Sequence, residues 1–240
     1  VAADQYKIEH RIEGQNISHL NWGTSAAKTV TMSFWIRSNK TGNTQVALLN
    51  SANDRAYVAT FTINTTDTWE KKELTVAGET SGTWLTTNGV GLRLRWGSFG
   101  STYQTSSIDQ WVSSEKMSRD DSPINFFDNT ANELYITGVQ LEVGDTATPF
   151  EHRSFGDELA RCQRYLYRRD FNIYDVVCQG AALGNKGSYC LHLPVSMRAK
   201  PSCSQGSGIY CWYNQAGSIT TQTGLAVSYM GNNDTNMTQA

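Results

Sequence analysis

Five carboxylates lie within a short stretch of the sequence, and paired carboxylates are the groups that hydrolyse glycosidic bonds. They are Asp109, Glu115, Asp120, Asp121 and Asp128. A glycosidase needs two carboxyl groups that face each other across the bond to be cleaved. A charge-rich stretch between strands is usually a solvated loop, and proximity in the sequence does not place two side chains across a substrate. We therefore expect no catalytic residue, and a glycan-depolymerising tailspike enzyme stays as an alternative.

Residue types that bind metals or act as nucleophiles form no recognisable motif in this sequence. The four histidines, His10, His19, His152 and His192, lack the His-x-His and His-x-x-x-His spacings of metal sites. There is no Gly-x-Ser-x-Gly motif, and the Gly-rich turns lack the Lys-Ser/Thr ending of a phosphate-binding loop. The sequence predicts no metal, no cofactor and no enzymatic activity.

All five cysteines fall in the last third of the chain and show no metal-ligand spacing. They are Cys162, Cys178, Cys190, Cys203 and Cys211. An odd number with irregular spacing and no Cys-x-x-Cys pair argues against a complete disulfide framework. We expect reduced thiols that mostly act as small apolar residues. The alternative is one or two bridges among the last four.

Aromatic side chains are the remaining group with recognisable chemistry, because their faces stack on the CH groups of sugar rings. Trp96, Tyr103 and Trp111 lie in and just after the longest Gly/Ser/Thr-rich loop, and we predict them as ligand-binding residues. The competing interpretation is that they belong to a β-sandwich core. Trp35 and Trp69 are predicted to pack in the core or between sheets.

The segments that would position these residues are short and alternating, with helical periodicity scarce in the first two-thirds. Predicted strands cover residues 6–12, 29–36, 46–49, 57–63, 74–76, 90–96 and 134–141. Turn residues separate them, as at 40–43, 53–54 and 97–100. The charged stretch 113–123 is predicted to be an exposed loop, with a short helix as the alternative. About eight such strands predict an all-β, jelly-roll-type β-sandwich.

The sequence changes character after Pro149. Residues 154–166 contain the only convincing helical pattern, with Leu159, Cys162 and Leu166 at helical spacing. Short strands then resume at 171–177, 189–195, 209–213 and 225–229. We therefore predict a jelly-roll domain at 1–152, a helical connector at 153–168 and a small β domain at 169–240.

Charge and hydropathy exclude two classes of partner. Twenty basic and twenty-two acidic residues give a net charge of −2, and no Lys/Arg run forms a footprint for nucleic acid. No apolar stretch approaches the roughly 20 residues that cross a bilayer. Since the chain begins at Val1 with an element that looks already under way, we expect an upstream part.

The junction between the predicted domains resembles a signature of tailed-phage structural proteins. It comprises Val139-Gln140-Leu141-Glu142, then Ala147-Thr148-Pro149-Phe150-Glu151, then Glu158-Leu159-Ala160 and Cys162-Gln163-Arg164-Tyr165. Residues 11–16, 31–38, 82–84 and 193–201 are also similar, so the resemblance covers about residues 1–200. It implies a tail-fibre or head-fibre subunit with a carbohydrate-binding-module-like jelly roll, located in the virion after assembly in the bacterial cytoplasm.

The small final domain has an unusual density of aromatic residues. A module of roughly 70 residues is near the size at which a core becomes marginal, and oligomerisation would remedy that. We therefore predict a homotrimer whose interface includes Tyr165, Phe171, Tyr174 and Trp212. The expected partners are other copies, other virion proteins and a host surface glycan. The alternative is a binding module of a secreted polysaccharide-degrading enzyme.

Overall fold

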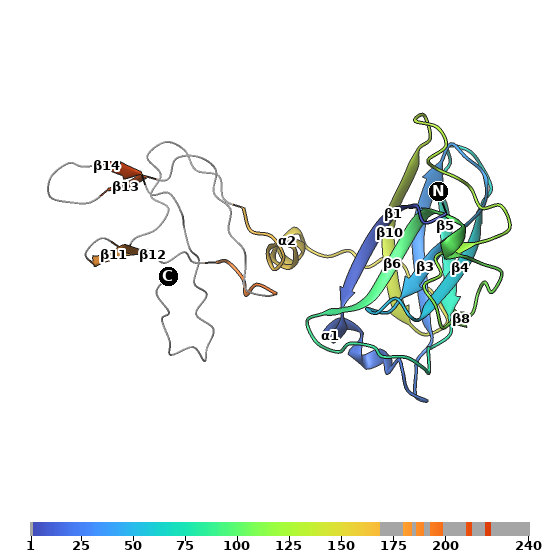
Figure 1. Ribbon diagram of the computed structural model, residues 1–240, viewed down its shortest axis with the longest axis horizontal. Helices are drawn as coiled ribbons and strands as arrows, with labels where there is room; N and C mark the ends of the chain where they lie inside the picture. Colours follow the sequence, from blue (N-terminus) through green and yellow to red (C-terminus); the bar gives the residue numbers. More distant parts are fainter. Residues whose placement is uncertain are drawn as a thin grey trace. The chain divides into compact units, whose positions relative to one another are not determined.

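The computed structural model describes residues 2–168, 180–183, 186–189, 193–198, 210–212 and 219–221. The chain divides into two compact units, Val1–His152 and Arg153–Ala240. Figure 1 shows the first unit as a layered set of strands and the helix α2 at the start of the second. The candidate site lies in the first unit.

Two antiparallel sheets form the first unit (Figure 1). The five-stranded sheet has the order β1 (Gln5–Glu13), β6 (Val90–Phe99), β3 (Gly42–Leu49), β4 (Ala56–Ile63) and β8 (Trp111–Val112). The three-stranded sheet has the order β10 (Leu134–Val143), β2 (Val30–Ser38) and β5 (Glu70–Val76). The chain passes between the sheets after β1, β2, β4 and β5 and again before β10. The predicted all-β, jelly-roll-type sandwich is confirmed.

The core lies between the sheets because alternate residues of each strand point to the same side. Val30, Met32, Phe34 and Ile36 on β2 are all buried and face inward. From the opposite sheet, β6 and β3 contribute buried partners to the same cluster, namely Leu92, Leu94, Trp96, Val46 and Leu48. Because the even-numbered residues of β2 face the core, its odd-numbered residues lie on the outer face of the three-stranded sheet.

The structure corrects the predictions for two loops. The expected turn at 97–100 is the end of β6, since that strand runs to Phe99. Gly97 allows this at a φ of +151°, because a Cβ there would lie 2.0 Å from the Tyr6 carbonyl oxygen. The stretch 113–123 is only partly exposed, because Met117 is fully buried against Ala47 and Leu49 on the outer side of the five-stranded sheet.

Short elements complete the first unit. A turn of helix and a 3-10 helix follow β1, and the segment that covers the five-stranded sheet contains another 3-10 helix and a small parallel pair of strands. These elements are α1 (Gly14–Ile17), η1 (Ser18–Leu20), η2 (Ser101–Tyr103), β7 (Gln104–Thr105) and β9 (Ser118–Arg119).

The second unit begins with α2 (Phe155–Gln163), inside the segment predicted to be helical. Ser154 caps it, because its Oγ accepts a hydrogen bond from the Asp157 backbone N–H at 3.2 Å. Two antiparallel pairs follow, β11 (Gly180–Leu183) with β12 (Lys186–Tyr189) and β13 (Tyr210–Trp212) with β14 (Ile219–Thr221). The strands predicted at 171–177 and 225–229 lie outside the described residues.

Cys162 is an exposed free thiol. The predictions for the other four cysteines fall outside the side chains that the structure describes. None of the described helices is long and apolar enough to cross a membrane.

Candidate functional site

Four of the five carboxylates that suggested hydrolysis contact a structural partner in the fold. The Asp109 carboxylate accepts hydrogen bonds from the Thr60 backbone N–H at 2.9 Å and the Thr60 Oγ1 at 2.7 Å. Three others form ion pairs: Glu115 with Arg95, Asp121 with Arg119, and Asp128 with Lys40. Hydrogen bonds from Arg119 and Lys40 lower the pKa of Asp121 and Asp128 respectively. Loop anchoring accounts for the positions of these four side chains.

Trp96 lies on the inward face of β6 rather than in an exposed loop. It is 4% exposed and packs edge-on against Phe34, with ring centroids 5.9 Å apart. The expectation of an exposed side chain is therefore wrong, because Trp96 shares the inward side of β6 with Leu92 and Leu94. The competing interpretation of Trp96 as a core residue is confirmed. The Trp96 Nε1–H is buried and makes no hydrogen bond, which is unusual for a buried donor.

Trp111 is half-buried in an aromatic cluster at one end of the sandwich. Its ring contacts Trp22, Trp84 and Tyr57 with centroid separations of 5.3, 5.5 and 5.3 Å. Its Nε1–H donates to the Ala77 carbonyl oxygen at 2.8 Å. This side chain connects β8 to the loop that follows β5, which is a structural role.

Tyr103, the third predicted ligand residue, lies neither in the core with Trp96 nor in the aromatic cluster with Trp111. It lies on η2 and packs against the small cluster that contains Phe99 and Met117. The three predicted residues therefore occupy three separate environments and do not form one site.

The aromatic side chains that do reach the surface together are on the outer side of the three-stranded sheet. Trp35, Trp69 and Tyr135 are 41%, 42% and 44% exposed. The prediction of Trp35 and Trp69 as core residues is wrong, because Phe34 and Ile36 point inward and neighbouring positions on β2 must point outward. We call Trp35, Trp69 and Tyr135, with Arg37 among them, the outer aromatic face.

The strand register holds these four residues next to one another. Tyr135 on β10 lies opposite Arg37 on β2, and Trp35 lies opposite Thr137 and Lys71. The Trp69 and Tyr135 rings are 6.3 Å apart at 57°. The Arg37 guanidinium is 5.6 Å from the centre of the Tyr135 ring. Positive charge and aromatic rings are thus combined on one exposed sheet surface.

Two acidic residues fix the polar groups of this face. Arg37 forms an ion pair with Asp67 at 3.5 Å, which holds the guanidinium beside the ring. A hydrogen bond to Glu133 raises the pKa of Tyr135, and the nearby Glu133 charge adds to that effect. The Tyr135 hydroxyl therefore stays protonated, donates its proton to Glu133 and keeps its oxygen able to accept a hydrogen bond.

The segment after β10 folds back over the same side of the sheet. The Glu142 carboxylate accepts from the Thr148 backbone N–H at 3.0 Å, and the Gln140 Oε1 accepts from the Glu151 backbone N–H at 2.8 Å. This brings Phe150 within 3.9 Å of the position that a Cβ of Gly138 would take. Residues 140–151 therefore fold back beside Trp35.

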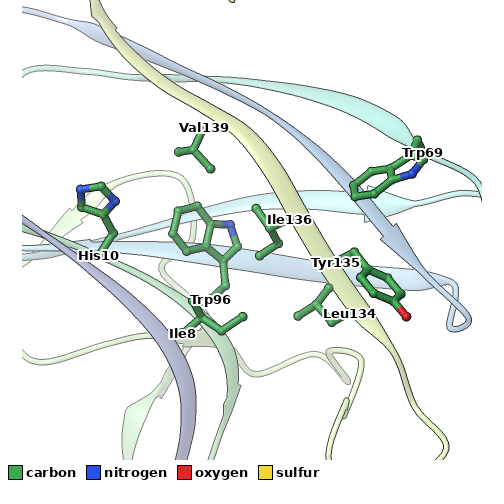
Figure 2. Close-up of a pocket in the computed structure, with 8 residues that line it drawn as sticks. All are labelled: Ile8, His10, Trp69, Trp96, Leu134, Tyr135, Ile136 and Val139. Carbon is green, nitrogen blue, oxygen red and sulfur yellow. The ribbon is translucent and has the colours of Figure 1, made fainter. Parts of the chain in front are cut away.

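A groove of about 450 Å³ borders the outer aromatic face. Figure 2 shows Trp69 and Tyr135 on one side of β10 and Ile8, His10 and Trp96 on the other. Its remaining lining is aliphatic: Leu134, Ile136 and Val139. Val139 belongs to a β-bulge, because the β10–β2 register shifts between Thr137 and Gln140. The volume is within the range of small-molecule sites.

Among the described residues, no group of three or more His, Cys, Asp or Glu side chains is placed to hold a metal ion. Comparison of the chain with protein-family models, with curated proteins and with solved structures finds no match.

Sequence reasoning missed Tyr135 and Arg37 and misplaced Trp35 and Trp69. A usable signal was present in β2, where Val30, Met32, Phe34 and Ile36 fix the inward positions. The odd-numbered residues of this strand, Trp35 and Arg37 included, then point outward whenever that sheet has one open side. Tyr135 needs the pairing of β10 with β2, which no local pattern reveals.

Proposed function

We propose that this chain is a non-enzymatic structural subunit of a tailed-phage appendage, and that its first unit binds a host surface glycan on the outer aromatic face. The observation that supports binding is the exposure of Trp35, Trp69 and Tyr135 on one sheet surface. The resemblance of the junction residues to phage fibre proteins supports the virion assignment.

The chemistry of the outer aromatic face suits a sugar. Aromatic faces stack on the apolar CH surface of a pyranose ring. For pairs of aromatic rings, such stacking contributes about 0.5–1.5 kcal/mol in addition to the burial of apolar area. Arg37 and Lys71 border these rings, and their carboxylate partners Asp67 and Glu73 provide acceptors for hydroxyl groups. A surface with rings and both signs of charge matches a ligand with CH faces and many hydroxyls.

The non-enzymatic assignment rests on the carboxylates. Asp109, Glu115, Asp121 and Asp128 each have a structural partner, which explains their presence without catalysis. The rival functions are a glycan-depolymerising tailspike and a binding module from a secreted enzyme. Release of oligosaccharides from a bound polysaccharide would favour the first rival.

The proposed assembly is a homotrimer held by the second unit. In support, α2 and the residues after it expose Phe155, Leu159, Tyr165 and Leu166, a large apolar surface for so short a segment. Of the other predicted interface residues, Trp212 lies on β13, while Phe171 and Tyr174 lie outside the described residues.

Titration calorimetry with bacterial surface polysaccharides tests the location of the glycan site. We expect Trp69→Ala and Tyr135→Ala each to weaken binding about tenfold or more, since losing 1.4 kcal/mol is a factor of ten. The matched control is Phe127→Ala, because Phe127 is also exposed but lies off this face and stacks on Tyr6. Equal losses in all three variants, or loss only in the control, would contradict the assignment.

A further inference from the structure

Three of the four edges of the two main sheets in the first unit carry features that prevent pairing with another strand. β8 has only two residues. β5 places Glu70 and Lys72 on its inward side, opposite Ile36 and Phe34. β10 is interrupted by the bulge at Gly138, whose φ is +58°. These are the usual ways in which an exposed edge avoids association.

β1 is different from the other three edges. It has nine residues, contains no Gly or Pro, and its only register shift lies at its end, between Ile12 and Glu13. Its outer edge has no strand partner in the described part of the chain. Tyr6 and Ile8 point toward the groove side and are 50% and 51% exposed. A long, regular edge with exposed apolar side chains is suited to accept another strand.

The charges of β1 restrict which strand fits. On the face away from the groove, Lys7, Glu9 and Arg11 alternate in sign. We propose that β1 pairs antiparallel with β1 of a second copy of this chain, about a two-fold axis at Ile8. Lys7 then lies opposite the partner's Glu9, and Tyr6 lies opposite the partner's His10. The two Ile8 side chains cover each other.

Neighbouring registers are less favourable. An axis at Glu9 places Glu9 opposite the partner's Glu9 and Lys7 opposite the partner's Arg11, so like charges meet on both sides. An axis at Lys7 brings the two lysines together. An axis at His10 pairs opposite charges but requires Glu13, which is buried and follows the register shift. Ile8 is the axis that joins opposite charges and covers the exposed apolar residues.

The backbone supports the same pairing. The Asp4 carbonyl oxygen accepts from the Gly100 N–H at 2.9 Å, so even-numbered residues of β1 direct their hydrogen-bonding groups toward β6. Odd-numbered residues direct theirs outward and are available to the partner. Ile8 and the partner's Ile8 would form a non-hydrogen-bonded pair, in which Cα atoms are about 4.5 Å apart. The contact continues the five-stranded sheet into a second copy and does not depend on glycan binding or on the second unit.

Disulfide trapping of the full chain tests this register. A Cα separation of about 4.5 Å is within disulfide range, so Ile8→Cys should cross-link to the same position of a second copy under mild oxidation. Tyr6→Cys alone should not cross-link through position 6, whereas a mixture of Tyr6→Cys and His10→Cys should. Because the chain has five native cysteines, the linked positions are mapped by peptide mass spectrometry, with the unmodified chain as control.

A charge-reversal variant tests separately whether the ion pairs across the β1 contact matter. Lys7→Glu places a carboxylate opposite the partner's Glu9 and should reduce the Ile8→Cys cross-link several-fold, while Lys71→Glu on the other sheet should leave it unchanged. Absence of the position-8 cross-link, or self-linking of Tyr6→Cys instead, overturns the register. A position-8 cross-link that Lys7→Glu does not reduce overturns the role of the charges.

Discussion

Three tryptophans at one end of the first unit use their indole N–H groups to fasten loops. Trp22 donates to the Lys28 carbonyl oxygen at 2.7 Å, and Trp84 donates to that of Ser81 at 3.1 Å. Trp111 does the same with Ala77, and its ring contacts both other indoles. Trp35 and Trp69 are exposed instead, so residue type alone does not decide between packing and binding.

We predict opposite effects for the two kinds of tryptophan. Trp111→Ala should lower the free energy of unfolding by about 3 kcal/mol, because it opens a cavity and leaves the Ala77 carbonyl without its donor. Glycan affinity of the folded fraction should not change. Chemical denaturation and calorimetry on the same samples measure both, and Trp69→Ala should show the reverse pattern. A loss of affinity without loss of stability in Trp111→Ala would restore the sequence-based assignment.

Glu9 is predicted to make folding stability depend on acid pH. Burial acts to raise its pKa, but hydrogen bonds from Arg11 and Arg95 and the charge of Arg95 outweigh this and lower it to about 2. A carboxyl group whose pKa falls on folding stabilises the native state above its ordinary value of 4.5. That contribution should be lost as the pH falls from about 4.5 to about 2.

The variant Glu9→Gln tests this contribution. Arg95 is almost completely buried and bonds Glu9 at 2.6 Å, so the variant leaves a buried cation short of one partner and should cost about 3 kcal/mol at neutral pH. Its unfolding free energy should also change less between pH 4.5 and 2 than that of the parent. Parallel pH profiles for the two proteins would show that Glu9 is not the titrating group.

At the scale of elements, alternation along strands predicted most of the sandwich but not its exceptions. β2, β6 and β10 lie where their apolar patterns indicated, because apolar side chains of each pack against the core between the sheets. The continuation of β6 past Gly97 could not be foreseen, since it depends on the close approach of β1. The same is true of Met117, whose burial depends on a loop crossing the five-stranded sheet.

The bulge in β10 is predicted to support the outer aromatic face. Gly138 has a φ of +58°, and an added Cβ would lie 3.3 Å from the Trp35 Cδ1. Gly138→Ala should therefore cost about 1–2 kcal/mol of stability and also weaken glycan binding by displacing Trp35. Gly144→Ala is the control, since its φ is +117° but nothing lies within 4 Å of the added atom. It should strain the backbone and leave binding unchanged.

At the scale of the whole molecule, the division after His152 separates the proposed glycan site from the proposed trimer contact. The candidate site could not be predicted as a whole, because Trp69, Arg37 and Tyr135 come from three separate parts of the chain that meet only through sheet pairing. The sequence did indicate the relevant chemistry, which is aromatic residues on a β-sandwich.

Removing the second unit is predicted to abolish trimer formation without affecting glycan binding. The full chain should sediment as a trimer at low concentration, and trimers should associate weakly through the two-fold β1 contact as the concentration rises. A chain of residues 1–155 should lose the trimer and keep its glycan affinity per site. The β1 contact would leave the shortened chain as a monomer in weak exchange with a dimer. Sedimentation velocity distinguishes these species, and a trimer of residues 1–155 would place the main interface in the sandwich.

The central claim, that this chain binds a glycan without cleaving it, is tested most directly by incubating the full chain with bacterial capsular polysaccharides and lipopolysaccharides. Bound polysaccharide and newly formed reducing ends are measured on the same samples. We expect at least one polysaccharide to be retained intact, with binding reduced about tenfold by Trp69→Ala and with no new reducing ends. Released oligosaccharides that disappear in Asp120→Asn or Asp109→Asn, or no binding to any polysaccharide, would contradict the account.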